Sequence, residues 1–261
     1  MKKKVFLLTL LILSGIVIIV RHLPYYQPAT KTNEVPVSLQ HDDDTLRITY
    51  IGDSWAEFHQ QHNCHLDTMV SRLTGRPVKV RTAGISGLTS KEIYYSIFQN
   101  HNVRDAVINW HPDYCVVNAG VNDSERKMGA GYYKESMRLI VDYMLRSHIV
   151  PILLEIPRYN SSRMFRIRGI PSKMLYLTSM LIHLSAMDCI DEYRRTLDEL
   201  IEEQGWASKI ILIRTDSWNP LGYEDERNIY DYLQLHLNEK GYEVLDSCIA
   251  SYISTQIKNQ H

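Results

Sequence analysis

The residues best suited to chemistry in this 261-residue chain follow three short runs of apolar and β-branched residues. The segments 52–54 (Gly-Asp-Ser), 83–87 (Ala-Gly-Ile-Ser-Gly) and 119–123 (Ala-Gly-Val-Asn-Asp) each come where such a run ends. Ser54 precedes a segment with helical spacing, and the unpaired N–H groups at a helix start can stabilise a nearby anion. A serine in this position is suited to nucleophilic attack. Taken alone, however, the pattern is better explained by a turn in which Ser54 caps the helix.

The other two segments supply groups that a nucleophilic serine needs around it. Acyl transfer requires hydrogen-bond donors aimed at the developing oxyanion, and a glycine N–H and an asparagine amide are suitable donors. Gly87 and Asn122 stand at the second and third strand ends, where such donors would be needed. His236, just before an Asn-capped helix start late in the chain, is a candidate general base. Together these four residues predict a serine-dependent acyl-transfer site.

In combination, these segments resemble the four conserved blocks of the SGNH (GDSL-type) hydrolases. The blocks lie at 52–54, 84–87, 120–123 and 236–241, in the family's order. The resemblance implies that Ser54 is the nucleophile and His236 the base. It also implies an oxyanion hole built from the Ser54 and Gly87 backbone N–H groups and the Asn122 amide. The fold implied is a flavodoxin-like three-layer α/β/α sandwich with a mainly parallel five-stranded sheet. The resemblance further implies an enzyme that acts on esters without a metal or other cofactor.

The sequence departs from the family pattern at two positions. Trp55 replaces the usual leucine of the first block, which we expect to affect packing or the pocket mouth and not the chemistry. The family places an acidic partner three residues before the histidine, and here that residue is Leu233. The nearest acid is Asp231, five residues before His236. We expect Asp231 to reach the imidazole through a two-residue bulge; the alternative is a Ser–His dyad oriented by a backbone carbonyl.

Strand-like and helix-like segments alternate after residue 45 and would position these groups. Strands are predicted at residues 46–51, 78–82, 114–118, 149–155 and 210–214, with apolar residues at helical spacing between them. The alternation implies right-handed crossovers and a mainly parallel, doubly wound α/β sheet in one domain, residues 46–261. Ligand sites in such sheets lie beyond the carboxyl ends of the strands. The segments that contain Ser54, Gly87 and Asn122 are predicted to lie there.

The N-terminus has the pattern of a membrane anchor. Three lysines precede an apolar run at residues 5–20, and Arg21 follows it. No small-residue cleavage site follows the run, so we favour an uncleaved signal-anchor at residues 1–22 over secretion after cleavage. The basic start predicts that the rest of the chain lies outside the cytoplasm, as in a bacterial membrane-anchored enzyme. Residues 23–45, which contain three prolines and three consecutive aspartates, are predicted to form a tether.

Composition narrows the choice of partner. The formal net charge is -1, so no overall basic field exists to hold a polyanion, and nucleic acid is not an expected partner. The 17 tyrosines against 4 phenylalanines favour rings with a hydroxyl, which would suit polar ligands such as sugars. The leading hypothesis is an esterase that removes O-acetyl groups from cell-envelope or capsular polysaccharide. The alternatives are a polysaccharide O-acyltransferase, a lysophospholipase-like esterase, and a non-catalytic carbohydrate-binding module.

Two further segments have competing interpretations. His59, His62, Cys64 and His65 suggest metal binding, but they form no carboxylate-backed set, so we expect a polar pocket rim or a solvated helix face. Residues 158–180 are basic first and apolar afterwards. Because they follow a strand end, they could form a lid that contacts an anionic sugar or the bilayer surface. A helix that completes the core is the equally weighted alternative.

Overall fold

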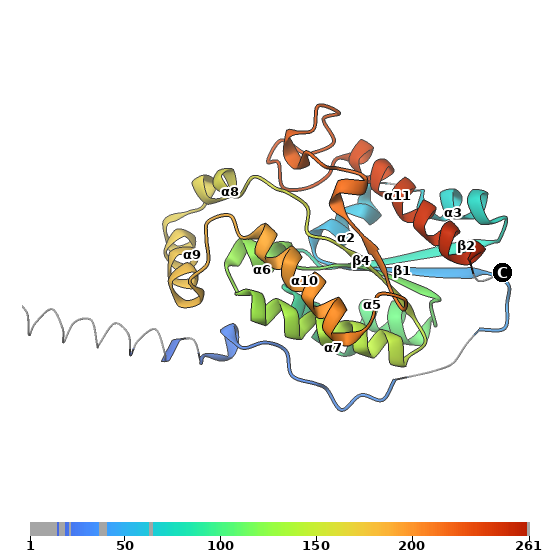
Figure 1. Ribbon diagram of the computed structural model, residues 1–261, viewed down its shortest axis with the longest axis horizontal. Helices are drawn as coiled ribbons and strands as arrows, with labels where there is room; N and C mark the ends of the chain where they lie inside the picture. The colour runs from blue at the N-terminus through green and yellow to red at the C-terminus, as the bar shows by residue number, and fades with distance from the viewer. Residues whose placement is uncertain (1–14, 16–18, 21, 37–40, 63–64, 260–261) are drawn as a thin grey trace, which may run out of the picture.

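The computed structural model describes residues 15, 19–20, 22–36, 41–62 and 65–259, and most of the predicted anchor lies outside them. At its centre is a five-stranded sheet in the order β2-β1-β3-β4-β5, with every neighbouring pair parallel (Figure 1). The strands are β1 (Leu46–Gly52), β2 (Val78–Gly84), β3 (Tyr114–Asn118), β4 (Val150–Leu154) and β5 (Ile211–Ile213). All five predicted strands are present within a few residues of their expected positions.

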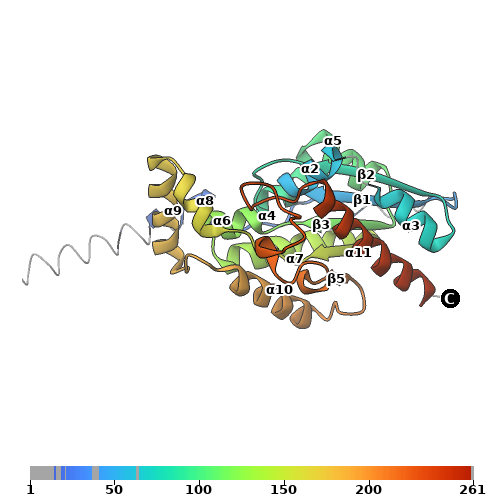
Figure 2. The same ribbon diagram turned by 90° about the horizontal axis from the view of Figure 1, so that it is seen from above.

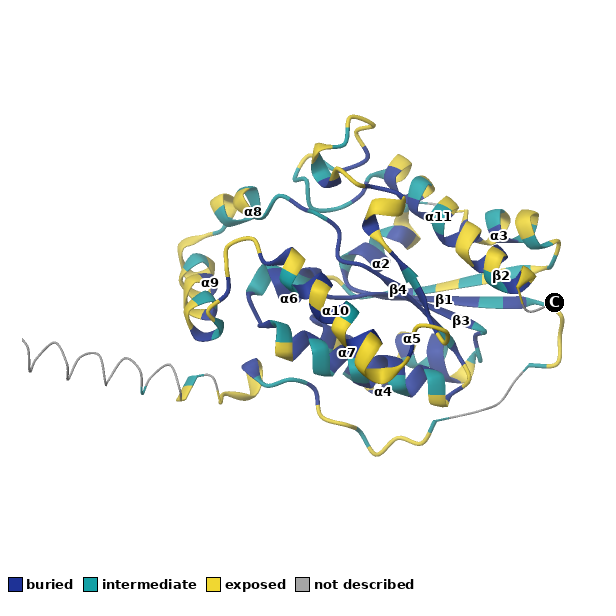
Figure 3. Cartoon of the chain, in the orientation of Figure 1, coloured by how far each residue is buried: buried dark blue, intermediate teal, exposed yellow. Residues whose placement is uncertain are grey.

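Helices cover both faces of the sheet and give three layers (Figures 1 and 2). The helices are α2 (Ser54–Gln61), α3 (Leu66–Thr74), α4 (Ser90–Gln99), α5 (His101–Arg104), α6 (Val121–Arg126), α7 (Ala130–Arg146), α8 (Ser161–Ile167), α9 (Ile170–His183), α10 (Ile190–Gln204) and α11 (Glu239–Lys258). The remaining helical segments are the single 3-10 turns η1 (Pro24–Tyr26), η3 (Thr215–Ser217) and η4 (Gly222–Glu224) and the π-helix η2 (Asp105–Asn109). In Figure 3, α2, α3 and α11 lie above the sheet, and α4, α7 and α10 lie below it. The predicted α/β sandwich is therefore confirmed.

Burial follows the periodicity of each element. The central strands β1, β3 and β4 are almost wholly buried, as parallel strands between two helix layers must be (Figure 3). The apolar residues at helical spacing in α7 and α11 face inward. Their buried members include Met137, Ile140, Val141 and Met144 in α7, and Tyr242, Leu245, Ile249 and Ile253 in α11. The core is thus formed between the sheet and these stripes.

The strand register brings the three candidate segments to one edge of the sheet. Gly52, at the end of β1, pairs with Gly84 on β2 and with Asn118 on β3. Gly52 has φ +157°, and a Cβ there would lie 2.3 Å from the Asn118 carbonyl oxygen. At Gly84 a Cβ would lie 2.0 Å from the Glu57 backbone nitrogen, because α2 starts directly against β2. The two glycines allow the chain turns that carry Ser54 and Gly87 to meet.

The predicted tether does not stand free of the domain. Residues 24–36 lie along its surface, where the Thr30 and Thr32 N–H groups donate to the hydroxyls of Tyr95 and Tyr94, each at 3.0 Å. Lys91 Nζ also donates to the Pro24 carbonyl at 2.7 Å. Tyrosine hydroxyls on α4 therefore hold this segment against the domain. Among the described residues, no helix combines the length and the apolar character needed to cross a membrane.

Helices α8 and α9 project from one end of the molecule (Figures 1 and 2). They follow β4, and most of the outer surface of α9 is exposed (Figure 3). The alternative in which residues 158–180 complete the core is therefore wrong for most of these side chains. Apolar residues at helical spacing predict a helix, but they do not indicate whether another element covers its apolar face.

Candidate active site

Ser54 begins α2 directly beyond the carboxyl end of β1. Asp53 caps this helix, and its Oδ1 accepts a hydrogen bond from the Trp55 N–H at 3.0 Å. Ser54 Oγ lies 2.9 Å from His236 Nε2, although the two residues are 182 positions apart in the chain. The Phe58 ring contacts the His236 ring edge-on, with 4.7 Å between centroids. A serine hydroxyl and an imidazole nitrogen are thus within proton-transfer distance.

A short hairpin-like loop before α11 carries His236. Tyr230 and Leu237 form an antiparallel bridge, and the Asp231 N–H donates to the His236 carbonyl at 2.8 Å. The loop is closed below by Asn238, which caps α11 by accepting from the Gly241 N–H at 3.1 Å. A Cβ at Gly241 would lie 2.3 Å from the Ile229 carbonyl, so this close approach requires glycine. These contacts fix the direction in which the imidazole leaves the backbone.

Asp231 faces the other imidazole nitrogen. Its Oδ2 lies 3.5 Å from His236 Nδ1, and its Oδ1 accepts from the Leu235 N–H at 3.2 Å. The intervening chain turns through Gln234, which has φ +59°. Partial burial opposes ionisation of Asp231, but the contact with His236 and the backbone N–H bonds outweigh it and lower its pKa. A turn closed by the Gln234 N–H on the Asp231 carbonyl therefore brings Asp231, and not Leu233, to the imidazole.

Two backbone N–H groups near Ser54 remain available to a ligand. Within the described chain, neither the Ser54 N–H nor the Gly87 N–H donates to a protein acceptor. Gly87 has φ +81°, and its carbonyl accepts a hydrogen bond from Arg126 Nη2 at 2.6 Å. By holding the carbonyl, Arg126 fixes the peptide that joins Gly87 to Leu88. Both free donors are of the type that stabilises a tetrahedral oxyanion.

Asn122 extends from the start of α6 toward the same region. Its Nδ2 donates to Asp53 Oδ2 at 2.9 Å and to the Leu88 carbonyl at 3.1 Å. Since both partners are acceptors, the amide nitrogen and not the amide oxygen must face them. Asp53 and Leu88 therefore fix the orientation of the amide before any substrate binds. An oxyanion would share an amide hydrogen with one of these acceptors.

Two buried carboxyl groups lie beneath the site. Burial raises the pKa of Asp53 to about 7, against the lowering effect of the Trp55 N–H bond and the His236 charge. Burial likewise raises the pKa of Asp123 to about 6, although the Ser90 N–H and hydroxyl both donate to it. Asp123 thereby ties α6 to the start of α4. Asp53 thus links the first and third strand-end segments through Asn122, and Asp123 links the third to α4.

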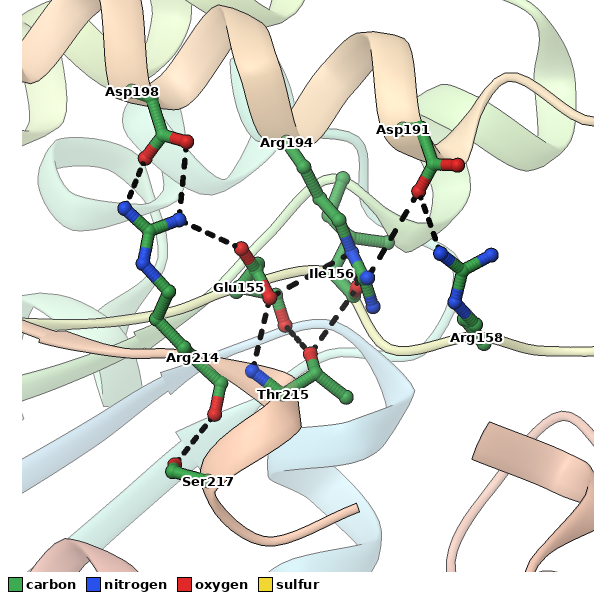
Figure 4. Close-up of polar contacts among 9 residues, drawn as sticks. All are labelled: Glu155, Ile156, Arg158, Asp191, Arg194, Asp198, Arg214, Thr215 and Ser217. Carbon is green, nitrogen blue, oxygen red and sulfur yellow. Dashed lines mark hydrogen bonds and ion pairs between the residues drawn. The ribbon is translucent and has the colours of Figure 1, made fainter. Parts of the chain in front are cut away.

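An ion-pair network fixes the point where the His236 loop leaves the sheet (Figure 4). Glu155, 7% exposed at the end of β4, accepts from Arg214 Nη1 at 3.1 Å and from the Thr215 N–H at 2.9 Å. Asp198 on α10 also binds Arg214, at 2.7 Å. Arg194 Nε donates to the Ile156 carbonyl at 2.8 Å and lies 3.7 Å from Glu155. The network joins β4, α10 and the chain after β5.

His59 differs from its expected place. It is 3% exposed and pairs with buried Asp246 of α11, with Nε2 and Oδ1 2.8 Å apart. The prediction of a pocket rim or solvated face was therefore wrong for His59, because α11 packs over this side of α2. A cavity of about 670 Å³ beside edge strand β2 is lined in part by His59, but neither Ser54 nor His236 lines it. Cys64 lies outside the described residues, which contain no group of three metal-binding side chains.

Several site residues were not identified from the sequence. Asp53 had an N-cap signal but no signal for its contact with Asn122. Arg126 lies four residues after Asn122, so helical spacing could have placed both on one face of α6. Phe58 likewise lies four residues after Ser54. No local sequence pattern predicts the Glu155 network, because its members are distant in the chain and are brought together by the order of the strands.

Comparisons with known proteins identify the family. Residues 50–244 match the model of the GDSL-like lipase/acylhydrolase family, which covers more than half of the chain. The chain belongs to this family. As a GDSL-like lipase/acylhydrolase it is an ester hydrolase, and the matched segment contains every residue discussed in the site except Asp246. No curated protein sequence matches it.

Solved structures with low sequence identity share the GDSL-like fold. The lipase/acylhydrolase from Enterococcus faecalis is 19% identical with a TM-score of 0.57, covering 81% of this chain and 96% of that one. A putative acylhydrolase from Bacteroides fragilis is 18% identical with a TM-score of 0.56, covering 84% and 91%. An acetylxylan esterase from Geobacillus stearothermophilus is 17% identical with a TM-score of 0.54, covering 80% and 94%.

Proposed function

We propose that this GDSL-like hydrolase is a serine esterase that works through an acyl-enzyme at Ser54. The observation that carries the proposal is the chain of contacts from Ser54 through His236 to Asp231, at 2.9 Å and 3.5 Å. It is the arrangement of nucleophile, base and orienting carboxylate that activates a serine. Ser54 Oγ would attack the ester carbonyl while His236 Nε2 takes its proton.

The remaining groups then have defined tasks in the two half-reactions. The tetrahedral anion would be held by the N–H groups of Ser54 and Gly87 and by the Asn122 amide. Its collapse breaks the ester C–O bond, and His236 returns the proton to the departing alcohol. Water, deprotonated by His236, attacks the Ser54 ester, and collapse of the second anion releases the acid and restores the serine. Asp231 would hold Nδ1–H toward itself and stabilise the imidazolium.

For the substrate we propose O-acetyl groups on carbohydrate of the cell envelope or capsule. Ser54, Gly87, Asn122 and His236 are all partly exposed, so the site is open toward solvent and accessible to a substituent on a bulky polymer. Two of the similar solved structures are acetylxylan esterases, which supports the same substrate class at low identity. The abundance of tyrosine is compatible with sugar binding.

We also propose that the chain is anchored by residues 1–22, with the hydrolase domain outside the cytoplasm. The support is the sequence of three lysines, a sixteen-residue apolar run at 5–20 and Arg21. Retention of the N-terminal residues in protein recovered from washed membranes would support an uncleaved anchor. Release of a shortened chain into the medium or periplasm would instead support cleavage and secretion.

The experiment that tests the proposed function is acetate release from O-acetylated oligosaccharides by the full chain. We expect release that Ser54→Ala abolishes, and transfer products should be absent when an unacetylated sugar is added as acceptor. A lysophospholipid and p-nitrophenyl acetate serve as comparison substrates. Faster turnover of the lysophospholipid would reject the carbohydrate assignment, and transfer in excess of hydrolysis would favour an acyltransferase. Activity that survives Ser54→Ala would reject the mechanism.

A further inference from the structure

The outer face of α9 carries a continuous apolar stripe that no part of the described chain covers. Its members, spaced four and three residues apart, are Ile170, Met174, Leu177, Leu181 and Leu184, the last just beyond the helix. Each is between 48% and 88% exposed. Helix positions with this spacing lie on one face. We call these five residues the α9 stripe.

The orientation of α9 is fixed by contacts on its other side. Tyr176, Ser179 and Ile182 are buried against the domain. The Tyr176 hydroxyl donates to the Met187 carbonyl at 3.3 Å, and Ile182 packs in a cluster with Met128 and Tyr132. The stripe therefore points outward because the inner face is already packed. Contiguous exposed apolar surface of this kind normally marks an interaction site.

The segment of chain that carries the stripe has charged side chains of one sign. Residues 157–187 contain five arginines and lysines and no aspartate or glutamate, in a chain whose overall charge is -1. Arg158 pairs with Asp191 and Arg168 with Glu125, whereas Arg163 and Arg166 form no ion pair with a described residue. The end of the molecule that carries the α9 stripe thus also carries, on α8, positive charge without an ion-pair partner among the described residues. An anionic, apolar partner complements it.

The chain's own N-terminal apolar run reaches the domain at the same place. Val20, the last residue of that run, packs against the cluster that contains Ile182. Tyr26 follows, and its hydroxyl lies 3.1 Å from Ser179 Oγ while its ring lies 5.4 Å from that of His183. Figure 1 shows η1 lying beside α9 at the end of the molecule where α8 and α9 project. The end of the apolar run at Val20 therefore lies beside α9.

We propose that the α9 stripe is a membrane-docking surface that lies in the headgroup region of an anionic phospholipid bilayer. Helices with an apolar face beside basic residues bind there, with the apolar side chains at the acyl boundary and the cations on the phosphates. A second copy of this chain fits less well, because it would bring two acid-free basic segments together. This surface is separate from the ester chemistry and does not depend on the substrate assignment.

Docking would also determine how the active site faces the membrane. α8 is joined to the catalytic loop at Asn160, whose N–H donates to the Gln234 carbonyl at 3.1 Å and whose Nδ2 donates to Gln234 Oε1 at 2.8 Å. Gln234 is the turn residue between Asp231 and His236. The start of α8 and the loop of the proposed catalytic histidine are therefore connected through Asn160 and Gln234. Esters attached close to the bilayer surface would be held near Ser54.

The test uses the full chain with a polarity-sensitive fluorophore on single introduced cysteines. Met174→Cys and Leu181→Cys place the probe in the α9 stripe, and Leu73→Cys places it on α3 at the opposite end (Figure 1) as the matched control. Cys64 and Cys248 are replaced by serine. Each protein is inserted singly into nanodiscs of phosphatidylcholine, with or without phosphatidylglycerol. We expect blue-shifted emission and quenching by spin-labelled lipid at 174 and 181 but not at 73.

Charge neutralisation gives an independent measurement. Arg163→Gln together with Arg166→Gln should reduce the lipid-immersed population by about fivefold for each arginine in phosphatidylglycerol discs, since each basic group near an anionic surface contributes about that factor. Equal water accessibility at 174, 181 and 73 would overturn the proposal, even if the chain remains in the disc through its N-terminus. The proposal would also be overturned if the probes at 174 and 181 became buried without lipid, either with rising protein concentration or on addition of polysaccharide.

Discussion

Replacing Asp231 by asparagine tests whether this residue orients the histidine in place of the usual acid. The variant keeps an oxygen that can accept the Leu235 N–H, so the loop should remain folded. Its amide nitrogen, however, would face His236 Nδ1 and donate to it, which favours the wrong imidazole tautomer. The negative charge that stabilises the imidazolium is also lost. We therefore expect a fall in kcat with little change in KM.

The size of the loss follows from the 3.5 Å separation between Asp231 Oδ2 and His236 Nδ1. Two unit charges at that distance interact by about 5 kcal/mol at an effective dielectric of about 20 and by about 1 kcal/mol in bulk water. The Asp231 side chain is 26% exposed, which places the pair between these limits. At about 1.4 kcal/mol for each factor of ten, the expected loss in kcat is roughly 10²-fold.

The assay is steady-state hydrolysis of p-nitrophenyl acetate, with circular dichroism and thermal unfolding as checks on folding. Asp225→Asn is the matched control, because Asp225 lies in the same connection but pairs with Arg227 and not with His236. A loss below about threefold, or an equal loss in Asp225→Asn, would refute the assigned role. Either result would leave a Ser–His dyad as the better account of the site.

Three further predictions concern the groups around Ser54. Asn122→Ala should lower kcat by about 10²- to 10³-fold with KM nearly unchanged, as loss of an oxyanion donor does; a loss mainly in KM would contradict this. Gly84→Ala should leave little folded protein, because the added Cβ would lie 2.0 Å from the Glu57 nitrogen; a melting temperature within a few degrees of wild type would count against it. Asp53 has a folded pKa of about 7 against about 3.9 unfolded, so the folded state binds the extra proton between these values. The free energy of unfolding should therefore fall as pH rises from about 4 to about 7, and Asp53→Asn should remove that part of the slope in urea titrations. An unchanged slope would show that Asp53 does not titrate in this window.

The fold could be predicted because its signals are local. Strands β1 to β5 appear as short β-branched runs, and α7 and α11 as apolar stripes, so alternation alone gave a parallel α/β sheet. The approximate positions of Ser54, Gly87 and Asn122 followed from the rule that parallel strands present their carboxyl ends on one side. Even the contact between Asp231 and His236 could be expected, since few acids lie near that histidine in the chain.

The remaining features depend on contacts between distant segments. The sequence around His59 predicts an exposed or rim position, because it contains no signal for the contact with Asp246. Asp246 reaches His59 only when α11 packs over α2. Residues 24–36 look like a spacer, yet the Tyr94 and Tyr95 hydroxyls hold them against α4. The apolar residues of α9 suggested core burial as strongly as exposure. In each case the deciding partner is far away in sequence, and hydrophobic periodicity carries no information about it.

The proposed acyl-enzyme mechanism is tested most directly by trapping the acylated protein and locating the acyl group. The full chain is mixed with excess p-nitrophenyl acetate, quenched in acid during the first turnover, digested and analysed by mass spectrometry. We expect one acetyl group on Ser54 in the peptide that contains Gly52 and Asp53, more of it at early times than at exhaustion of substrate, and none in Ser54→Ala. Acetyl groups elsewhere, or full turnover with no acetylated Ser54 at any time, would contradict it.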